Sequence, residues 1–381
     1  MSQSPPVVAH AAATPRQQRT PGARISELDG LRGIAILLVL VFHYTPSSGP
    51  LFLLDHIFQI GWSGVDLFFV LSGYLITGIL LDTAGRRHYY RNFIVRRTLR
   101  IFPLYYACLL LYAFLTFYPT PVRWGDYMGP GDAAWYLAYI GNLKAFVQNA
   151  WPGAAILTPL WSLQVEEQFY LSFPFIVGAV RRRTLARILF ASVVVAFLLR
   201  VGLTMAMPKN LLGTYLLMPS RMDALAMGGL VAIARREWPE HLKSHWIPRG
   251  TAISALIAVV VCVIWGESPW SGAMRTLGFT AIDLVFTGVL VLLITGRPSG
   301  LLALCRKRPL VWLGTISYGL YLLHIPALTA ADKWIVPALR LAPRGSAEMM
   351  VAMAIAIGAA TLSWLFFESQ ILKWKERFTV R

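Results

Sequence analysis

The sequence predicts an all-α fold: an integral membrane bundle of about ten transmembrane helices. Of the 381 residues, 56% are hydrophobic and only 14% are charged, and the mean hydropathy is +0.58. A soluble domain carries about a quarter charged residues. Several apolar runs also reach about 18 residues, the length that a membrane-spanning helix needs.

Ten candidate spans follow one another along the chain, and proline and glycine clusters typical of turns separate most of them. The spans are expected near residues 31–48, 60–81, 100–119, 162–180, 186–206, 215–234, 250–266, 276–295, 309–331 and 347–368. The segment 133–147 is short and amphipathic, which favours an interfacial position over a spanning one.

The distribution of positive charge predicts the orientation. Most of the 35 Lys and Arg residues lie in the two terminal tails and in the even-numbered connections between spans. Cytoplasmic loops carry such an excess, so we expect a multi-pass protein of the cytoplasmic (inner) membrane with both termini cytoplasmic. This bias also accounts for the net charge of +17, so a nucleic-acid partner is not needed to explain it. The sequence holds no motif for binding RNA or DNA.

The domain organisation follows from composition. Residues 1–24 are rich in Pro, Ala, Gln and Arg and lack the apolar core of a signal peptide, so a disordered cytoplasmic tail is expected. Residues 25–370 form the predicted membrane domain, and residues 371–381 a basic cytoplasmic tail. The three cysteines are scattered, and no disulfide framework or metal site follows from their spacing.

The first span holds an arginine and a histidine in "LRGIAILLVLVFH". Eleven residues make about three helical turns, so Arg32 and His43 share nearly one face, roughly 16 Å apart. If Arg32 marks the inner boundary, His43 lies about midway through a ~30 Å core. A histidine there is suited to accepting and returning a proton, although a lone one is more often a packing residue.

The segment "TPLWSLQVEEQFYLSFP" predicts a polar helix face. Ser162, Glu166 and Tyr170 are spaced four apart and share one side, whereas Glu167 points about 100° away. A hydroxyl, a carboxylate and a phenol entering an apolar bundle need partners, and a cationic imidazole would be one.

Other ionisable residues allow two interpretations. Arg96, Arg97 and Arg100 crowd a cytoplasmic boundary, either as ordinary positive-inside bias or as a clamp for phosphate, which arginine binds bidentately. His324 in "SYGLYLLHIP" is interpreted first as a buried histidine with a satisfied hydrogen bond. Asp283 and Arg200 fit a structural ion pair or snorkelling side chains.

Taken together, these segments resemble the acyltransferase-3 family of multi-pass membrane acyltransferases, which modify surface glycans and other hydroxylated acceptors. Six motifs occur in the same order. They are "LDGLRGIAILLVLVFH" with Arg32 and His43, "GVDLFFVLSGYLIT" with Asp66 and Ser72, "VRRTLRIFPLYY" with Arg97 and Arg100, "LWSLQVEEQFYLSFP" with Ser162 and Glu166, "SRMDALAMGGLVA" with Arg221 and Asp223, and "ISYGLYLLHIP" with His324.

The resemblance implies an acyl-CoA co-substrate, most often acetyl-CoA, on the cytoplasmic side, with no permanently bound cofactor and no metal. The acceptor is a hydroxylated carbohydrate or lipid-linked sugar, usually reached from the other side. His43 would be the general base and Glu166 would orient it, as an acid does in a triad. Arg32, Arg97 and Arg100 would hold the phosphates of coenzyme A. The resemblance leaves Asp66, Ser72, Ser162, Tyr170, Arg221, Asp223 and His324 as candidates for lining the substrate channel.

Some family members carry an additional extracytoplasmic esterase-like domain, which is not expected in this chain. Transfer is then completed within the bundle or involves a separate acceptor-modifying or glycan-assembly protein. The alternative function is a proton-coupled transporter or flippase, which would use the same intramembrane charges. That alternative gives no reason for an arginine cluster beside the histidine-bearing helix.

Overall fold

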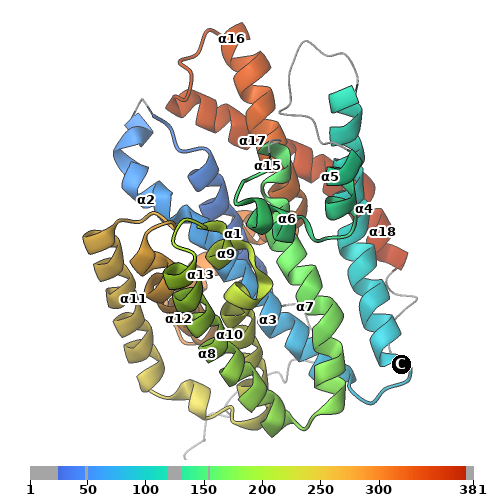
Figure 1. Cartoon of the computed structure of the whole chain (residues 1–381), viewed down its shortest axis with the longest axis vertical. Helices are drawn as coiled ribbons and strands as arrows, with labels where there is room; N and C mark the ends of the chain where they lie inside the picture. The colour runs from blue at the N-terminus through green and yellow to red at the C-terminus, as the bar shows by residue number, and fades with distance from the viewer. Residues whose placement is uncertain (1–24, 48–49, 118–129, 153–154, 375–381) are drawn as a thin grey trace, which may run out of the picture.

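A computed structural model describes residues 25–47, 50–117, 130–152 and 155–374. Its regular secondary structure within these ranges is entirely helical, which confirms the all-α prediction (Figure 1). The predicted tail at 1–24 lies outside the described residues, as do residues 375–381 of the predicted basic tail.

The α-helices are α1 (Ser26–His43), α2 (Asp55–Gln59), α3 (Gly64–Thr83), α4 (Tyr89–Phe117), α5 (Pro130–Leu137), α6 (Gly141–Gln148), α7 (Leu160–Ala179), α8 (Arg182–Ala206), α9 (Leu212–Leu216), α10 (Met218–Glu237), α11 (Trp246–Trp265), α12 (Phe279–Ile294), α13 (Gly300–Cys305), α14 (Arg308–Thr315), α15 (Ser317–Ala330), α16 (Val336–Ala338), α17 (Ser346–Ser363) and α18 (Ser369–Lys373). The expected interfacial segment at 133–147 is divided between the short helices α5 and α6.

Six helices in the described chain are long and apolar enough to cross a membrane, or seven if the bent pair α14 and α15 counts as one span. Their outer faces are apolar: on α11, Leu256, Val259 and Val263 are all exposed. Contiguous apolar surface of this kind suits lipid rather than water. A multi-pass membrane protein is therefore supported, whereas a count of ten spans stays a prediction.

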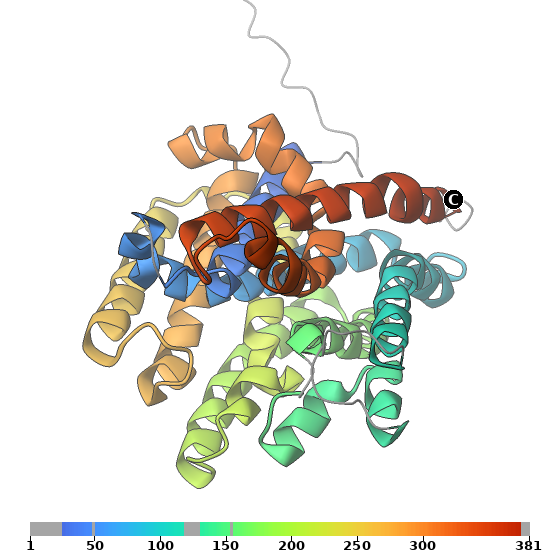
Figure 2. The same ribbon diagram turned by 90° about the horizontal axis from the view of Figure 1, so that it is seen from above.

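The centre of the bundle consists of α1, α3 and α10. In both views α1 and α3 lie in the middle, with α11 and α12 on one side and α4 on the other (Figure 1, Figure 2). Glycines bring α3 and α10 into backbone contact, because a Cβ on Gly73 would lie 1.9 Å from the Leu225 carbonyl oxygen. One on Gly228 would lie 2.0 Å from the Val70 oxygen.

Helix breaks position the residues discussed below. The pair α14 and α15 bends by 78° beside α1, and Ser317 begins the second half of the bend. A π-helical turn, Ala331–Ile335, follows α15 and carries Asp332 and Lys333. Such turns inside helices frequently occur at functional sites.

Candidate active site

A first cavity, of about 210 Å³, is enclosed by α1, α3, α4, α7 and α15. We call it the arginine cavity. Its polar lining residues are Arg32, Ser72, Arg97, Arg100, Ser162, Glu166, Tyr170, Ser317, Tyr318 and Tyr321. Seven of the residues predicted for the site (Arg32, Ser72, Arg97, Arg100, Ser162, Glu166 and Tyr170) therefore meet in one place.

Glu166 organises the polar side of the arginine cavity. The Ser72 hydroxyl donates to its Oε1 atom at 2.7 Å, and the Tyr170 hydroxyl donates to Oε2 at 2.8 Å. The shared face predicted for α7 is thus present, because Tyr170 lies one turn beyond Glu166. Ser162, one turn before, lies 2.7 Å from the Tyr321 hydroxyl.

Arginines from two helices surround this carboxylate. Arg32 and Arg97 both interact electrostatically with Glu166. Arg32 donates to the Ser317 hydroxyl at 3.0 Å, and the Arg97 guanidinium lies 5.5 Å from the centre of the Tyr170 ring. Arg97 and Arg100 also line a small adjoining cavity with Arg96, so positive charge continues along the first half of α4.

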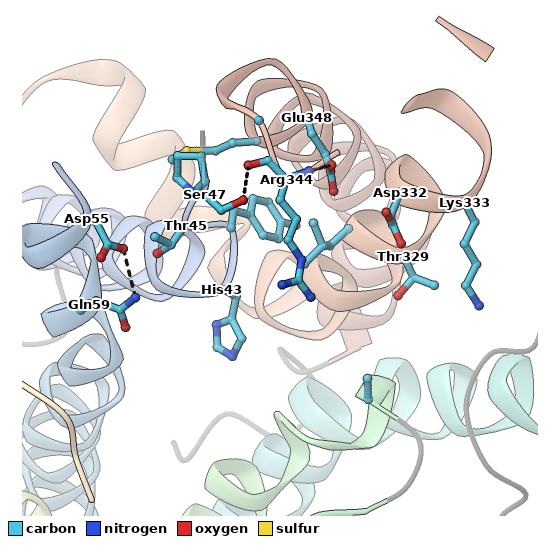
Figure 3. A pocket seen from close by; sticks show the side chains of 16 residues that line it. His43, Thr45, Ser47, Asp55, Gln59, Thr329, Asp332, Lys333, Arg344 and Glu348 are labelled. Atoms are coloured by element: carbon cyan, nitrogen blue, oxygen red, sulfur yellow. Dashed lines mark hydrogen bonds between the residues drawn. The ribbon is translucent and has the colours of Figure 1, made fainter. Parts of the chain in front are cut away.

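A second cavity, of about 700 Å³, contains His43, and we call it the histidine cavity (Figure 3). His43 is the last residue of α1. Its Nδ1 atom lies 2.9 Å from the Val39 carbonyl oxygen. Because a carbonyl only accepts, Nδ1 carries the proton in this bond, which leaves the Nε2 lone pair available as a base.

The structure does not bring Glu166 to His43. The two line different cavities, and in the described chain the hydrogen-bond partners of Glu166 are Ser72 and Tyr170. The reason is distance along a helix. Arg32 shares the arginine cavity with Glu166, and His43 lies eleven residues, or roughly 16 Å, further along α1.

The neighbour of His43 is His324 instead. The two ring centroids are 4.7 Å apart and the planes cross at 68°. His324 is fully buried, its Nδ1 lies 2.5 Å from the Tyr321 carbonyl oxygen, and its Nε2 has no hydrogen-bond partner among the described residues. The interpretation of His324 as a satisfied buried histidine thus holds for one nitrogen only. Sequence spacing gave no signal that the two histidines meet.

Asp66, Arg221 and Asp223 are placed elsewhere, in a buried cluster between α3, α8, α10 and α12. Arg221 forms an ion pair with Asp66, and Arg200 pairs with Asp223 at 2.6 Å. All four side chains are at most 1% exposed. None of them belongs to the lining of the arginine or histidine cavity. Arg200 forms its close ion pair with Asp223, and Asp283 interacts electrostatically with Arg200 and Arg221 in the same cluster.

Within the described ranges, no group of three or more His, Cys, Asp or Glu side chains is arranged to hold a metal ion. The polar groups that line the two cavities are guanidinium, ammonium, carboxylate, amide, hydroxyl and imidazole groups.

The comparisons with known proteins identify the class. Residues 25–368 match the model of the acyltransferase-3 family, described as an acyltransferase domain, and the chain belongs to this family.

Its relatives include a putative peptidoglycan O-acetyltransferase, YrhL, of Bacillus subtilis, 31% identical over 80% of this chain and 48% of the relative. The peptidoglycan O-acetyltransferase OatA of Listeria monocytogenes is 27% identical over 92% of this chain and 56% of that protein. The O-acetyltransferase OatA of Staphylococcus aureus is 28% identical over 81% of this chain and 51% of that protein. The chain thus spans about half the length of these relatives. No solved structure matches.

Proposed function

We propose that this chain is a membrane O-acyltransferase that moves an acyl group, most often acetyl, from acyl-CoA to a hydroxyl of a surface or exported glycan. The observation that carries the proposal is that α1 connects two cavities of different chemistry. Arg32 lines the arginine cavity near the start of the helix and His43 lines the histidine cavity at its end. The names of the relatives support acetyl as the group and a peptidoglycan sugar as one candidate acceptor.

The donor belongs in the arginine cavity. Arg97 and Arg100, continued by Arg96, offer fixed guanidinium groups that match phosphate oxygens bidentately. The Ser317 hydroxyl holds Arg32, and the Tyr170 ring lies against Arg97. With the phosphates held there, the thioester end of the donor extends along α1 toward His43, over roughly 16 Å.

The acceptor belongs in the histidine cavity. His43 Nε2 removes the proton of the acceptor hydroxyl as its oxygen attacks the thioester carbonyl. The carbon–sulfur bond then breaks, and the coenzyme A thiolate takes up a proton. The Val39 carbonyl orients the imidazole, which is the task first expected of Glu166. Buried His324, whose ring centroid lies 4.7 Å from that of His43, presents an Nε2 with no hydrogen-bond partner among the described residues beside the proposed base.

This scheme needs a bundle that separates two sides. Besides the six or seven apolar spans, α1, α4 and α7 have 18, 29 and 20 residues, or about 27–44 Å at ~1.5 Å per residue. Together with the seven spans obtained when the bent pair counts as one, these three more polar helices give the proposed ten-span bundle, whose even number of spans places both ends on the same, cytoplasmic, side.

Replacement of His43 tests the function. His43→Ala should lower acyl transfer by about 10²-fold or more, because general-base catalysis contributes that much. Mass spectrometry of envelope glycans from matched strains, with membrane protein levels checked, should show an acyl-sized mass that disappears in the variant. His245→Ala, at an exposed histidine outside both cavities, is the control.

An unchanged glycan profile in the His43→Ala strain would refute the role of His43. A His43→Ala protein that makes no acylated product but still moves substrate across vesicles would support the transporter instead.

A further inference from the structure

The histidine cavity has more polar groups than proton abstraction requires. Besides His43, side chains from α2, from the π-helical turn after α15 and from the start of α17 point into the same space (Figure 3). Arg344, on the loop between α16 and α17, lines the cavity as well. Its guanidinium extends into the cavity where His43 also points.

The backbone of Arg344 is held in an unusual conformation. Its φ of +53° lies in the left-handed region, which non-glycine residues adopt rarely. Three hydrogen bonds hold it there. The Arg344 carbonyl accepts from the Ser47 amide at 2.7 Å and from the Ser47 hydroxyl at 3.3 Å, and the Arg344 amide donates to Glu348 Oε2 at 2.6 Å. Backbone conformations of this kind are concentrated at functional sites.

The contact with Ser47 couples Arg344 to the proposed base. Ser47 follows His43 by four residues, so the segment that ends α1 also fixes the loop that carries Arg344. The backbone that carries Arg344 is therefore tied to the segment that follows His43 through the Ser47 amide and hydroxyl.

The guanidinium itself is available for a ligand. Within the described residues no carboxylate forms an ion pair with it. Of the acidic residues that line the cavity, Glu348 accepts from the backbone amide of Arg344, and Asp55 accepts from the Gln59 amide at 3.1 Å. Asp332 lies beside Lys333 on the π-helical turn. Arg344 thus presents to the cavity a planar fork of N–H donors that pairs with no described carboxylate.

We propose that Arg344 binds an anionic group, a carboxylate or a phosphate, carried by the acceptor close to the hydroxyl that is acylated. This inference rests on the proposed function and narrows its substrate class from any hydroxylated acceptor to an acidic glycan. Arginine binds both kinds of anion through paired hydrogen bonds. The hydrogen-bonded pair Asp55 and Gln59, in the same cavity, would bind neutral hydroxyl groups of the acceptor.

Binding measurements on the purified full chain in lipid nanodiscs test this. The probes are a neutral N-acetylglucosamine tetramer, a tetramer of the same length that contains glucuronic acid, and a phosphorylated N-acetylglucosamine oligomer. At least one anionic probe should bind about tenfold or more tightly than the neutral one, as charge-assisted hydrogen bonds allow. Tighter binding of the glucuronic acid probe would identify a carboxylate as the anionic group, and tighter binding of the phosphorylated probe would identify a phosphate.

Two matched variants isolate the side chain. Arg344→Gly removes the guanidinium but keeps the left-handed backbone, which glycine adopts freely, and should reduce anionic-probe affinity to that of the neutral tetramer. Arg340→Gly is the control, because Arg340 has the same φ of +53° and is exposed but does not line the cavity.

Equal affinity for neutral and anionic probes, no binding of any probe, or an anion preference that survives in Arg344→Gly would overturn the inference. Acetyl transfer to envelope glycan is followed in parallel for wild type and His43→Ala. If the wild-type chain shows no anion preference, or Arg344→Gly keeps it, while His43-dependent transfer is intact, the role of Arg344 alone is refuted. Anion binding that depends on Arg344 without any transfer refutes the proposed function alone.

Discussion

At the residue scale, the two cavities have different proposed tasks: the arginine cavity binds the charged donor, and the histidine cavity removes a proton from the acceptor. Glu166 accepts from Ser72 and Tyr170 in a space lined by three arginines, and in the proposed reaction it organises these cations. His43 has a backbone carbonyl on Nδ1 and a second histidine as neighbours, so Nε2 is the nitrogen left to act as the base. An acid and a base that looked like partners therefore serve different substrates in the proposed reaction.

The arginines give a prediction at this scale. Arg97→Ala should raise the KM for acyl-CoA by about tenfold or more while changing the KM for the acceptor little, because a charge-assisted bond to phosphate is lost. Steady-state transfer with each substrate varied in turn measures the split. Arg91→Ala is the control, since Arg91 lies exposed on the same helix outside the cavity linings. An equal rise in both KM values would contradict donor binding at Arg97.

At the element scale, the contact of α3 with α10 holds the buried Asp66–Arg221 ion pair and one wall of the arginine cavity. Asp66 and Ser72 lie on α3, and Arg221 lies on α10. The ion pair Asp66–Arg221 is buried, so removing one partner would leave an uncompensated charge, which costs about 3–5 kcal/mol. A structural role for the "SRMDALAMGG" motif follows from this placement.

The glycines of this contact give a second prediction. Gly228→Ala should destabilise the bundle by about 1–3 kcal/mol, because the added methyl group would overlap the Val70 carbonyl and force α3 and α10 apart. Thermal unfolding of the purified protein measures the effect. Gly358→Ala on α17 is the control, because a Cβ there meets no atom within 4 Å. Equal melting temperatures for the two variants would refute the close backbone contact as a source of stability.

At the scale of the whole molecule, the proposed reaction requires that the two cavities open to opposite sides of the membrane. Substituted cysteines test this orientation in a variant whose three native cysteines are replaced. Ala342→Cys, near the histidine cavity, should react with a membrane-impermeant thiol reagent in intact cells. Ala84→Cys, on the exposed loop before α4, should react only after permeabilisation. Labelling of both positions from the same side would refute the topology.

A feature of the fold or the site could be predicted from the sequence when it depends on residues that are close together in the chain. Hydropathy and loop charge are local, so the all-α membrane class and the approximate helix positions followed from composition. Helical periodicity is also local, and it correctly placed Glu166 and Tyr170 on one face of α7. The start of α4 at Tyr89, well before the expected span at 100, was missed because its arginines are not apolar.

The sequence by itself determined the helices, their polar faces and the family, because each of these depends on residues a few positions apart or on motif order. Only the tertiary structure decided which faces meet. It separated Glu166 from His43, placed His324 beside His43, paired Asp66 with Arg221 and turned Arg344 into the histidine cavity. These contacts join residues far apart in the chain, and their distances depend on helix packing and on backbone hydrogen bonds that no periodicity encodes.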